Sequence, residues 1–466
     1  MTEVAEHSRR VIPELAARHA AAARLRHDYA AVPAGARVRL AKKTSNLFRF
    51  RDDDPGLVTL DIAPFGKVLH VDPAGRVAIV GGMTTYEDLV DATLPHGLMP
   101  FVVPQLKTIT LGGAVCGLGI ESSSLRMGMP HESVLEMDIL TGDGEIVTAA
   151  PGGAHADLYR GFPNSYGTLG YALWLVIELM PVKPYVHLRH FRFDGVAAAM
   201  AAVGEIDAAG SYAGHRADFV DGVVFSPDEV YLTVAAFSEV APWLSDYTGQ
   251  HIFYQSLRGP AEDFLTIRDY IWRWDTDWFW CSRAFGAQRP MVRALWPRRL
   301  RRSDVYRRLV AFDQRHGLTT VMNARRGAPA REFVIQDVEI PLGRCADFYD
   351  FFSRRVGMSP VWICPLKLRG DRSWPLYPLE PGQVYVNFGF WGAVSLPAGE
   401  SDGYYNRQIE HEVTELGGHK GLYSTAYYEP EEFWRLYNGE AYTALKRRYD
   451  PDGRLADLYD KCVRRK

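Results

Sequence analysis

A glycine-rich stretch from Pro104 to Ser124 constrains this 466-residue chain more than any other feature. It reads PQLKTITLGGAVCGLGIESSS and places four glycines within eight residues: Gly112, Gly113, Gly117 and Gly119. Glycine lets a ligand approach the main chain closely, and successive free N–H groups in such a loop form a concave anion site. The stretch therefore indicates either a phosphate cradle or a plain glycine-rich turn between strands.

The same stretch contains a fragment of a dinucleotide-binding fingerprint. Gly117-Leu118-Gly119 resembles half of a Rossmann motif. That motif needs a preceding strand, a third glycine and the start of a helix. Here the third position is Ser122, and three consecutive serines open a helix poorly beyond its cap. We therefore exclude a Rossmann fold at this place.

Net charge and cysteine content exclude several classes of protein. The formal net charge is -3, which argues against a general nucleic-acid binder. The five cysteines are scattered without CxxC spacing, which predicts a reducing compartment with no disulfide framework and no zinc site. The charged N-terminus lacks the apolar region of a secretory signal. The most apolar run, residues 171–184, is too short to span a bilayer and is typical of a buried strand. We expect a cytoplasmic protein.

Two further segments, each directly after a predicted strand, carry groups that could bind an anion. Lys43, Ser45 and Asn46 follow the alternating run 36–41 and indicate either a second anion cradle or a solvated turn. The other segment joins the strand-like run 77–80 to a predicted helix over 85–94; it consists of Gly81, Gly82, Met83 and Thr84. Thr84 or Thr85 can cap that helix. A Gly-Gly turn at a helix N-terminus suits a pyrophosphate.

The chain divides into four parts. Residues 1–35 are typical of an amphipathic helix. Residues 36–185 carry many short strands and an Asp-Gly hairpin turn, which is an α+β pattern. Residues 186–415 are dense in aromatics and contain later strands, which predict a second, sheet-bearing domain. Residues 416–466 hold a glycine loop with titratable groups, followed by helix.

Four pieces in this order resemble a known family. They are Gly81-Gly82-Met83-Thr84, Thr110–Gly113 running to Glu121–Ser124, Asp138–Glu145, and Gly167–Gly170. Together they resemble the FAD-binding domain of the vanillyl-alcohol oxidase / p-cresol methylhydroxylase (PCMH) superfamily. The segments Gly119–Ser124, Pro181–Val186, Trp362–Pro365 and Glu432–Trp434 resemble its delta-24-sterol reductase-like branch. The resemblance covers about residues 40–460.

The resemblance implies an α+β flavoprotein: a PCMH-type FAD-binding domain over 36–185, an antiparallel-sheet substrate cap over 186–415, and a tail over 416–466 that returns to the FAD domain. The residues matching the FAD loops are Lys43, Ser45, Asn46, Gly81, Gly82, Met83, Thr84, Thr110, Gly112, Gly113, Gly117, Gly119, Ile120, Ser122, Ser123 and Gly170. Members with covalent FAD usually carry a histidine in the first loop. Here that place reads Lys43-Thr44-Ser45-Asn46, which implies dissociable FAD.

The implied reaction is the reduction of an isolated lipid double bond, with NADPH recharging FAD. Such a bond is unpolarised, so protonation to a tertiary cation is expected to precede hydride transfer from flavin N5. A proton donor must reach the alkene carbon. The expected donor is Tyr423 or His419, with Lys420 as a flavin-ring or charge partner, and Glu121 is a third candidate. The alternative is that His419 and Lys420 are surface residues and that Glu121 bonds the ribose or supports another group.

The composition, rich in alanine and arginine, suggests a bacterium with a GC-rich genome, where sterols are uncommon. Bacterial relatives of this branch reduce 10-methylene to 10-methyl fatty acyl chains, as in tuberculostearic acid formation. We therefore expect that substrate, made by a partner methyltransferase. The alternatives are a delta-24-sterol reductase-like activity and a flavin-dependent alcohol or sugar oxidase. A flavin-free lipid-binding or scaffolding protein on the same fold is a further one.

Two segments of the predicted cap suit a lipid substrate. The cluster Trp272–Trp280 can line an acyl tunnel or form packed core. The segment Arg289–Arg302 interleaves arginine with apolar residues. It suits either peripheral contact with the inner face of the cell membrane or a solvated basic surface.

Overall fold

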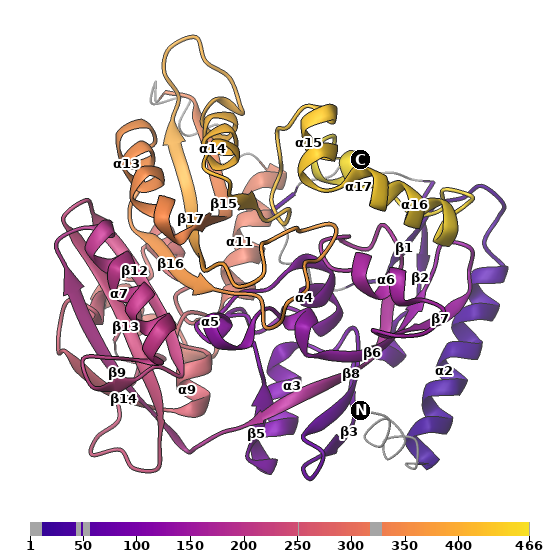
Figure 1. Cartoon of the computed structure of the whole chain (residues 1–466), viewed down its shortest axis with the longest axis horizontal. Coiled ribbons are helices and arrows are strands. Elements are labelled where there is room, and N and C mark those ends of the chain that lie inside the picture. Colours follow the sequence, from indigo (N-terminus) through magenta and orange to yellow (C-terminus); the bar gives the residue numbers. More distant parts are fainter. Residues whose placement is uncertain (1–11, 43–47, 50–55, 250, 317–328, 466) are drawn as a thin grey trace.

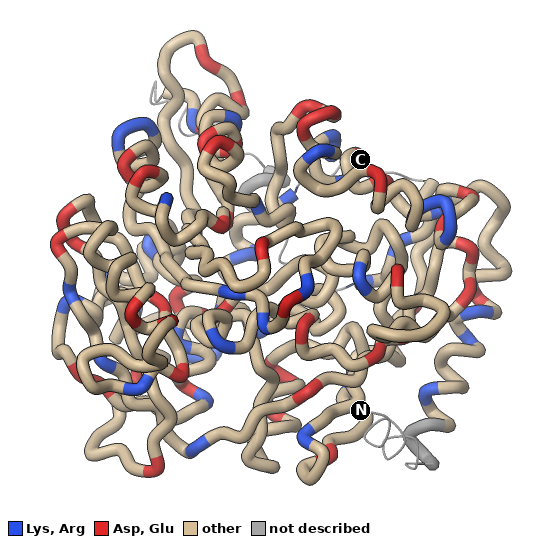
Figure 2. The backbone as a smooth tube through the Cα atoms, viewed as in Figure 1, with Lys and Arg blue, Asp and Glu red and all other residues tan. Residues whose placement is uncertain are grey.

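The computed structural model describes residues 12–42, 48–49, 56–249, 251–316 and 329–465 (Figure 1). Two β-sheets organise these residues into two lobes that lie side by side. The predicted α+β fold class, with a sheet-rich second part, is confirmed. Figure 2 shows basic and acidic residues interspersed over both lobes, which fits the net charge of -3.

The first lobe is built on a six-stranded antiparallel sheet. Its order is β3-β4-β8-β6-β7, and β5 also pairs with β8. The strand bounds are β3 (Val68–Asp72), β4 (Val77–Gly81), β5 (Leu98–Pro100), β6 (Val134–Leu140), β7 (Ile146–Ala149) and β8 (Tyr171–Pro181). A separate parallel pair joins β1 (Val38–Leu40) to β2 (Val58–Leu60). The predicted Asp143-Gly144 hairpin connects the paired strands β6 and β7.

Helices surround the sheet of the first lobe. They are α2 (Ile12–Ala30), α3 (Tyr86–Thr93), α4 (Leu111–Gly117), α5 (Ser124–Met127) and α6 (Ala156–Gly161). Helix α3 confirms the helix predicted over 85–94, and the Thr85 side chain caps it by accepting from the Asp88 N–H. Helix α4 differs from the expectation of an open glycine loop. It forms because the Thr110 side chain caps the helix by accepting a hydrogen bond from the Gly113 N–H.

The second lobe is an eight-stranded antiparallel sheet. Its order is β14-β9-β13-β12-β16-β17-β15-β18. The strand bounds are β9 (Tyr185–Phe193), β12 (Phe219–Ser226), β13 (Glu229–Ser238), β14 (Glu262–Thr266), β15 (Arg331–Pro341), β16 (Val361–Leu366), β17 (Tyr385–Ser395) and β18 (His419–Lys420). On one face it packs against the helices α7 (Val196–Ala209), α13 (Cys345–Arg355) and α14 (Tyr404–Glu415). The opposite face turns toward the first lobe.

Shorter elements join the lobes. Only residues 182–184 separate β8 from β9, so the chain passes directly from the first sheet to the second. Helices α8 (Phe253–Ser256), α9 (Ile267–Ile271), α10 (Pro290–Leu295) and α11 (Ser303–His316), with the 3-10 turn η5 (Arg298–Leu300), belong to the segment between β13 and β15. Within the described residues, no helix combines the length and apolar character needed to cross a bilayer.

The C-terminal segment returns to the first lobe (Figure 1). Its helices are α15 (Pro430–Leu436), α16 (Gly439–Tyr449) and α17 (Leu458–Cys462). Arg448 on α16 forms an ion pair with Asp157 on α6, with an N–O distance of 2.8 Å. The Gly142 N–H between β6 and β7 donates to the Tyr449 carbonyl at 2.7 Å. The tail therefore packs against the first lobe, although about three hundred residues separate the contacting positions in the sequence.

Candidate active site

A cavity of about 580 Å³ lies between the two lobes. Both lobes and the C-terminal tail contribute to its walls. The sequence-predicted residues that line it are Met83, Thr110, Gly112, Gly113, Gly117, Gly119, Ile120, Gly170 and Tyr423. The topology thus brings together residues that are more than three hundred positions apart in the chain.

Eight predicted cofactor residues are not found in the cavity lining, and three of them are not described by the structure. Gly81, Gly82, Thr84, Ser122 and Ser123 are not among the cavity-lining residues. Lys43, Ser45 and Asn46 fall outside the described residues. The cofactor role of these eight residues, like that of the residues that line the cavity, stays a prediction.

The Gly81–Thr84 turn is used in packing. The Gly82 N–H donates to the Leu173 carbonyl at 2.8 Å, and the Gly112 N–H donates to the Gly82 carbonyl at 2.8 Å. A Cβ on Gly112 would lie 2.8 Å from that carbonyl oxygen. Glycine is therefore needed at this position for α4 to seat against the turn. A diphosphate at the Gly82 amide would have to replace an existing hydrogen bond.

Two cations, Lys42 and Arg49, line the cavity without an acidic partner among the described residues. The Lys42 Nζ donates to the Thr110 hydroxyl at 3.2 Å and lines the cavity, where desolvation lowers its pKa. Arg49 is only 6% exposed; its guanidinium stacks 4.6 Å above the Tyr166 ring, and its Nε and Nη2 have no hydrogen-bond partner. Among the described residues, no carboxylate forms an ion pair with either. Buried cations need compensation, so this end of the cavity is suited to an anion.

Aromatic rings form the wall that faces α4. Phe279 packs on Trp391 and Trp362, with ring centroids 4.4 and 5.4 Å apart, and Trp278 stacks on Phe48 at 5.7 Å. Trp278 and Phe279 have φ of 46° and 59°. Bulky residues rarely adopt these left-handed angles, and such strain gathers at functional sites. The wall gives an apolar chain a surface of π-faces.

A pair of carboxyl groups lies in the same cavity. Asp337 and Glu339 are two residues apart on β15, so both point to the cavity face of the sheet. Burial raises the pKa of Asp337 to about 7 and that of Glu339 to about 8. The Asn387 amide donates to Asp337 at 3.2 Å, and the Tyr377 hydroxyl donates to Glu339. At neutral pH these groups therefore keep a much larger share of their protons than ordinary carboxyl groups do.

Tyr423 lies beside this acid pair. The Trp391 Nε1 donates to its hydroxyl at 2.8 Å, and the hydroxyl and the Asp337 carboxyl are close enough to change each other's pKa through hydrogen bonding. Burial raises the pKa of Tyr423 well above its usual range. The phenol consequently stays protonated and can donate.

The remaining predicted catalytic residues are placed outside the cavity lining. Lys420 is fully buried in an ion pair with Glu410 and also donates to the Thr425 carbonyl at 2.8 Å. Burial lowers the pKa of His419 to about 4, so its ring is neutral. Glu121 forms a buried ion pair with Arg273 at 2.9 Å. The roles predicted for these residues stay predictions.

Sequence reasoning missed Asp337 and Glu339. The available signal was two carboxylates at alternate positions in the second half of the strand REFVIQDVEIP, where the residues between and after them are apolar. Charged side chains on the inward face of a buried strand are expensive and therefore point to a function.

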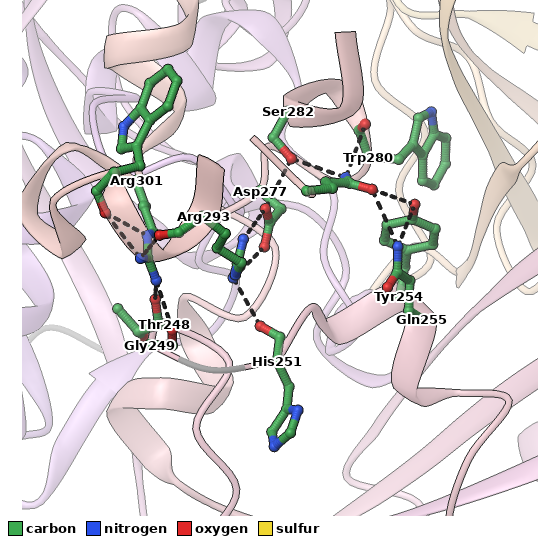
Figure 3. A network of polar contacts seen from close by, with 12 residues as sticks. Thr248, Gly249, His251, Tyr254, Gln255, Asp277, Trp280, Ser282, Arg293 and Arg301 are labelled. Carbon is green, nitrogen blue, oxygen red and sulfur yellow. Dashed lines mark hydrogen bonds and ion pairs between the residues drawn. The ribbon is translucent and has the colours of Figure 1, made fainter. Parts of the chain in front are cut away.

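A second cavity, of about 670 Å³, lies in the segment between β13 and α11. Figure 3 shows the polar network beside it: Arg293 pairs with Asp277 at 2.8 Å, and Arg301 donates to backbone carbonyls, including that of Gly249 at 2.7 Å. These guanidinium groups hold the local loops together. None of the predicted cofactor residues lines this cavity.

Comparison with known proteins finds an FAD-binding domain in the first part of the chain. Residues 17–150 match the family described as FAD binding domain. The Delta(24)-sterol reductase of Arabidopsis thaliana is 27% identical over 446 residues, covering 86% of this chain and 76% of the relative. The human Delta(24)-sterol reductase is 24% identical over 441 residues, covering 87% and 76%. Cytokinin dehydrogenase 2 of Oryza sativa subsp. japonica is 31% identical over 183 residues, covering 36% and 32%.

The chain is an FAD-dependent oxidoreductase. The residues of this flavoprotein fit the cofactor. The buried Arg49 nitrogens without partners and the nearby Lys42 suit its diphosphate. Gly117 and Gly119 let the main chain of the cavity wall pack closely, since a Cβ on Gly119 would meet Pro104 and one on Gly117 would meet Tyr166. Bound FAD would supply hydride chemistry in front of the aromatic wall and the acid pair.

Proposed function

We propose that this flavoprotein reduces an isolated carbon–carbon double bond in a lipid, and that the substrate is a 10-methylene fatty acyl chain converted to its 10-methyl form. The observation that carries the proposal is the placement of protonated carboxyl and phenol groups against an apolar aromatic wall in one cavity. The relatives that cover most of the chain are named as reductases of a sterol, which supports a lipid substrate with a C=C bond.

The aromatic wall suits both the substrate and the charge that develops on it. Trp278, Phe279 and Trp391 offer ring faces to an alkyl chain and exclude water from it. Protonation of a methylene-branched alkene leaves a tertiary cation, and ring faces attract cations most strongly where water is absent. A chain of CH₂ groups gains about 0.8 kcal/mol for each group buried.

The phenol and carboxyl groups of the cavity are suited to supply the proton. We propose that the Tyr423–Asp337 couple protonates the terminal methylene carbon, and that Glu339 with Tyr377 lies behind it as a second protonated pair. Hydride from the bound cofactor, recharged by NADPH, would complete the second C–H bond. The negative charge left on the couple returns to neutral when it takes a proton from water, which the raised carboxyl pKa values favour.

The proposed substrate also indicates which enzyme would make it and where in the cell this protein would work. A methyltransferase that generates a methylene-branched acyl chain is the class of enzyme that would provide this substrate. We propose a cytoplasmic enzyme that works at the inner membrane face through residues 289–302. The five cysteines are all free thiols, which supports a reducing compartment.

Two half-reactions measured separately test the function. Under anaerobic conditions, NADPH should bleach the flavin absorbance of the FAD-loaded protein. Addition of a 10-methylene phospholipid should then restore it, with the 10-methyl product seen by lipid mass spectrometry. If only a Δ24-sterol restores the flavin absorbance, the protein is a sterol reductase and the proposed acyl substrate is wrong. Bleaching by an alcohol or sugar, with none by NADPH, would replace the proposal with an oxidase.

A further inference from the structure

Exposed apolar side chains gather in one part of the chain. Nine large apolar residues among those described are strongly exposed, and eight of them lie between residues 240 and 312. They are Val240, Trp243, Leu244, Met291, Leu295, Leu300, Leu309 and Phe312; the ninth, Phe333, belongs to β15. Scattered exposed apolar residues are ordinary, whereas a concentration of them indicates an interaction surface.

The most exposed pair lies on one face of α10. Met291 and Leu295 are 81% and 84% exposed and stand four residues apart on this helix. Residues at that spacing point the same way. Leu300 in η5, 40% exposed, follows on the same segment. We call Met291, Leu295 and Leu300 the apolar ridge.

The ridge is held firmly from beneath. Arg293, between the two exposed residues, is buried and bonds Asp277 and the His251 carbonyl (Figure 3). Arg301, directly after Leu300, donates to the Thr248 and Gly249 carbonyls. The backbone that carries the ridge is therefore tied to the loop before α8. Its apolar side chains are presented to solvent by a supported segment.

Arginine surrounds the ridge. Residues 281–312 contain nine arginines, no lysine and a single acidic residue, Asp304. Arg289 and Arg299 flank the ridge and are exposed, and neither forms an ion pair with a carboxylate within the described part of the chain. Arg298 has one long contact, 3.5 Å, with Asp246. Other arginines of the segment are paired with Asp277, Glu87 and Asp304, so Arg289 and Arg299 are the exposed cations beside the ridge that are available to an anionic partner.

The same segment leads toward the cavity. Helix α11 begins shortly after η5 ends, and its Arg307 lies near enough to the cavity-lining Lys42 to lower the pKa of that lysine. Arg302, which lies between η5 and α11, donates two hydrogen bonds to the Glu87 carboxylate on α3, at 3.0 and 2.7 Å. The segment that carries the ridge therefore continues into a helix that lies near one end of the cavity.

We infer that the apolar ridge inserts into the headgroup–acyl boundary of an anionic bilayer, with Arg289 and Arg299 at the lipid phosphates. Apolar side chains that enter the interface and arginines that meet anionic lipid headgroups are the two components of peripheral membrane binding. A second protein copy would need acidic complementarity at its own ridge, which is basic. This inference rests on the proposed lipid substrate for its purpose, but it can be tested without any turnover.

The test is sedimentation of the FAD-loaded protein with vesicles. Wild type should bind vesicles containing phosphatidylglycerol, bind pure phosphatidylcholine vesicles weakly, and lose binding as salt rises. Met291→Glu with Leu295→Glu should weaken binding ~10-fold or more, because two apolar groups no longer enter the interface. Arg289→Glu with Arg299→Glu should weaken it by a similar ~10-fold factor and flatten the salt dependence.

Matched variants elsewhere complete the design. Phe333→Glu changes the exposed apolar residue outside the cluster, and Arg355→Glu changes an exposed arginine on α13; both should bind as wild type. Retained flavin absorbance in every variant shows that folding is intact. Reduction of a detergent-dispersed methylene ester should be unchanged in the ridge variants, so loss of docking and absence of the proposed activity are distinguishable.

Three results would overturn the inference. One is wild-type protein that stays in the supernatant with anionic vesicles. Another is equal loss of binding in the Phe333 or Arg355 variants. The third is a dimer in analytical ultracentrifugation that Met291→Glu with Leu295→Glu dissociates while vesicle binding is absent throughout, since the ridge would then be a self-association surface.

Discussion

Replacing Asp337 with asparagine should make the protein more stable and less active. Burial raises the carboxyl pKa from 3.8 to about 7. Between these values the folded protein keeps a proton that the unfolded chain releases, so this group lowers stability as pH rises from about 4 to about 7. At 1.36 kcal/mol for each pKa unit, the full cost is about 4 kcal/mol at most.

The Asp337→Asn variant would not carry that cost. The amide oxygen introduced there can still accept from the Asn387 amide, which donates to Asp337 at 3.2 Å in the wild type. The substitution should therefore raise the free energy of unfolding at pH 8 by up to about 4 kcal/mol, and the gain should vanish near pH 4. The assay is denaturant unfolding of the FAD-loaded protein at several pH values.

Activity should change in the opposite direction. Without the Asp337 proton, alkene-dependent reoxidation of the flavin should slow by roughly 10²–10⁴-fold, while bleaching by NADPH should keep its wild-type rate. Asp347→Asn, on the exposed start of α13, is the matched control and should alter neither property. A variant that is less stable at pH 8, or that reoxidises at the wild-type rate, would refute this reasoning.

Three further predictions concern the cofactor and the buried charges. Arg49→Leu should weaken FAD binding by about 10–100-fold in a fluorescence titration, because a buried cation suited to the diphosphate is lost; unchanged affinity would contradict that role. Gly112→Ala should destabilise the protein by about 1–3 kcal/mol, because its Cβ meets backbone, whereas Gly343→Ala, with open space around it, should not. Arg273→Met should cost about 3–5 kcal/mol in thermal unfolding, since it leaves two buried carboxylates unpaired; a stable variant would argue against an ionised cluster.

Local signals in the sequence predicted part of the fold correctly. The Thr85 cap, the Asp143-Gly144 hairpin and the apolar run of β8 all depend on neighbouring residues, and the structure has them where the pattern placed them. The glycine spacing likewise led to the cavity through Gly112, Gly113, Gly117 and Gly119. Helix α4 was not predicted, because its glycines have low helix propensity and form a helix only through the Thr110 cap and packing on Gly82.

The local pattern can draw attention to the acid pair but cannot give its pKa values. Asp337 and Glu339 acquire their raised pKa values from burial, which depends on β15 lying between β17 and β18 and on the C-terminal loop beside it. Conversely, His419 and Lys420 look reactive in sequence, yet β18 pairing and the Glu410 ion pair direct them elsewhere. Long-range topology decides which titratable groups share a cavity.

The contribution of the tail to the cavity has a consequence for biosynthesis. Tyr423 and Lys461 both line the cavity, so a nascent chain in which residue 461 is still inside the ribosome has only part of the cofactor wall. The cavity can then close only after release of α17, and a protease that clips the tail would open the cavity to water.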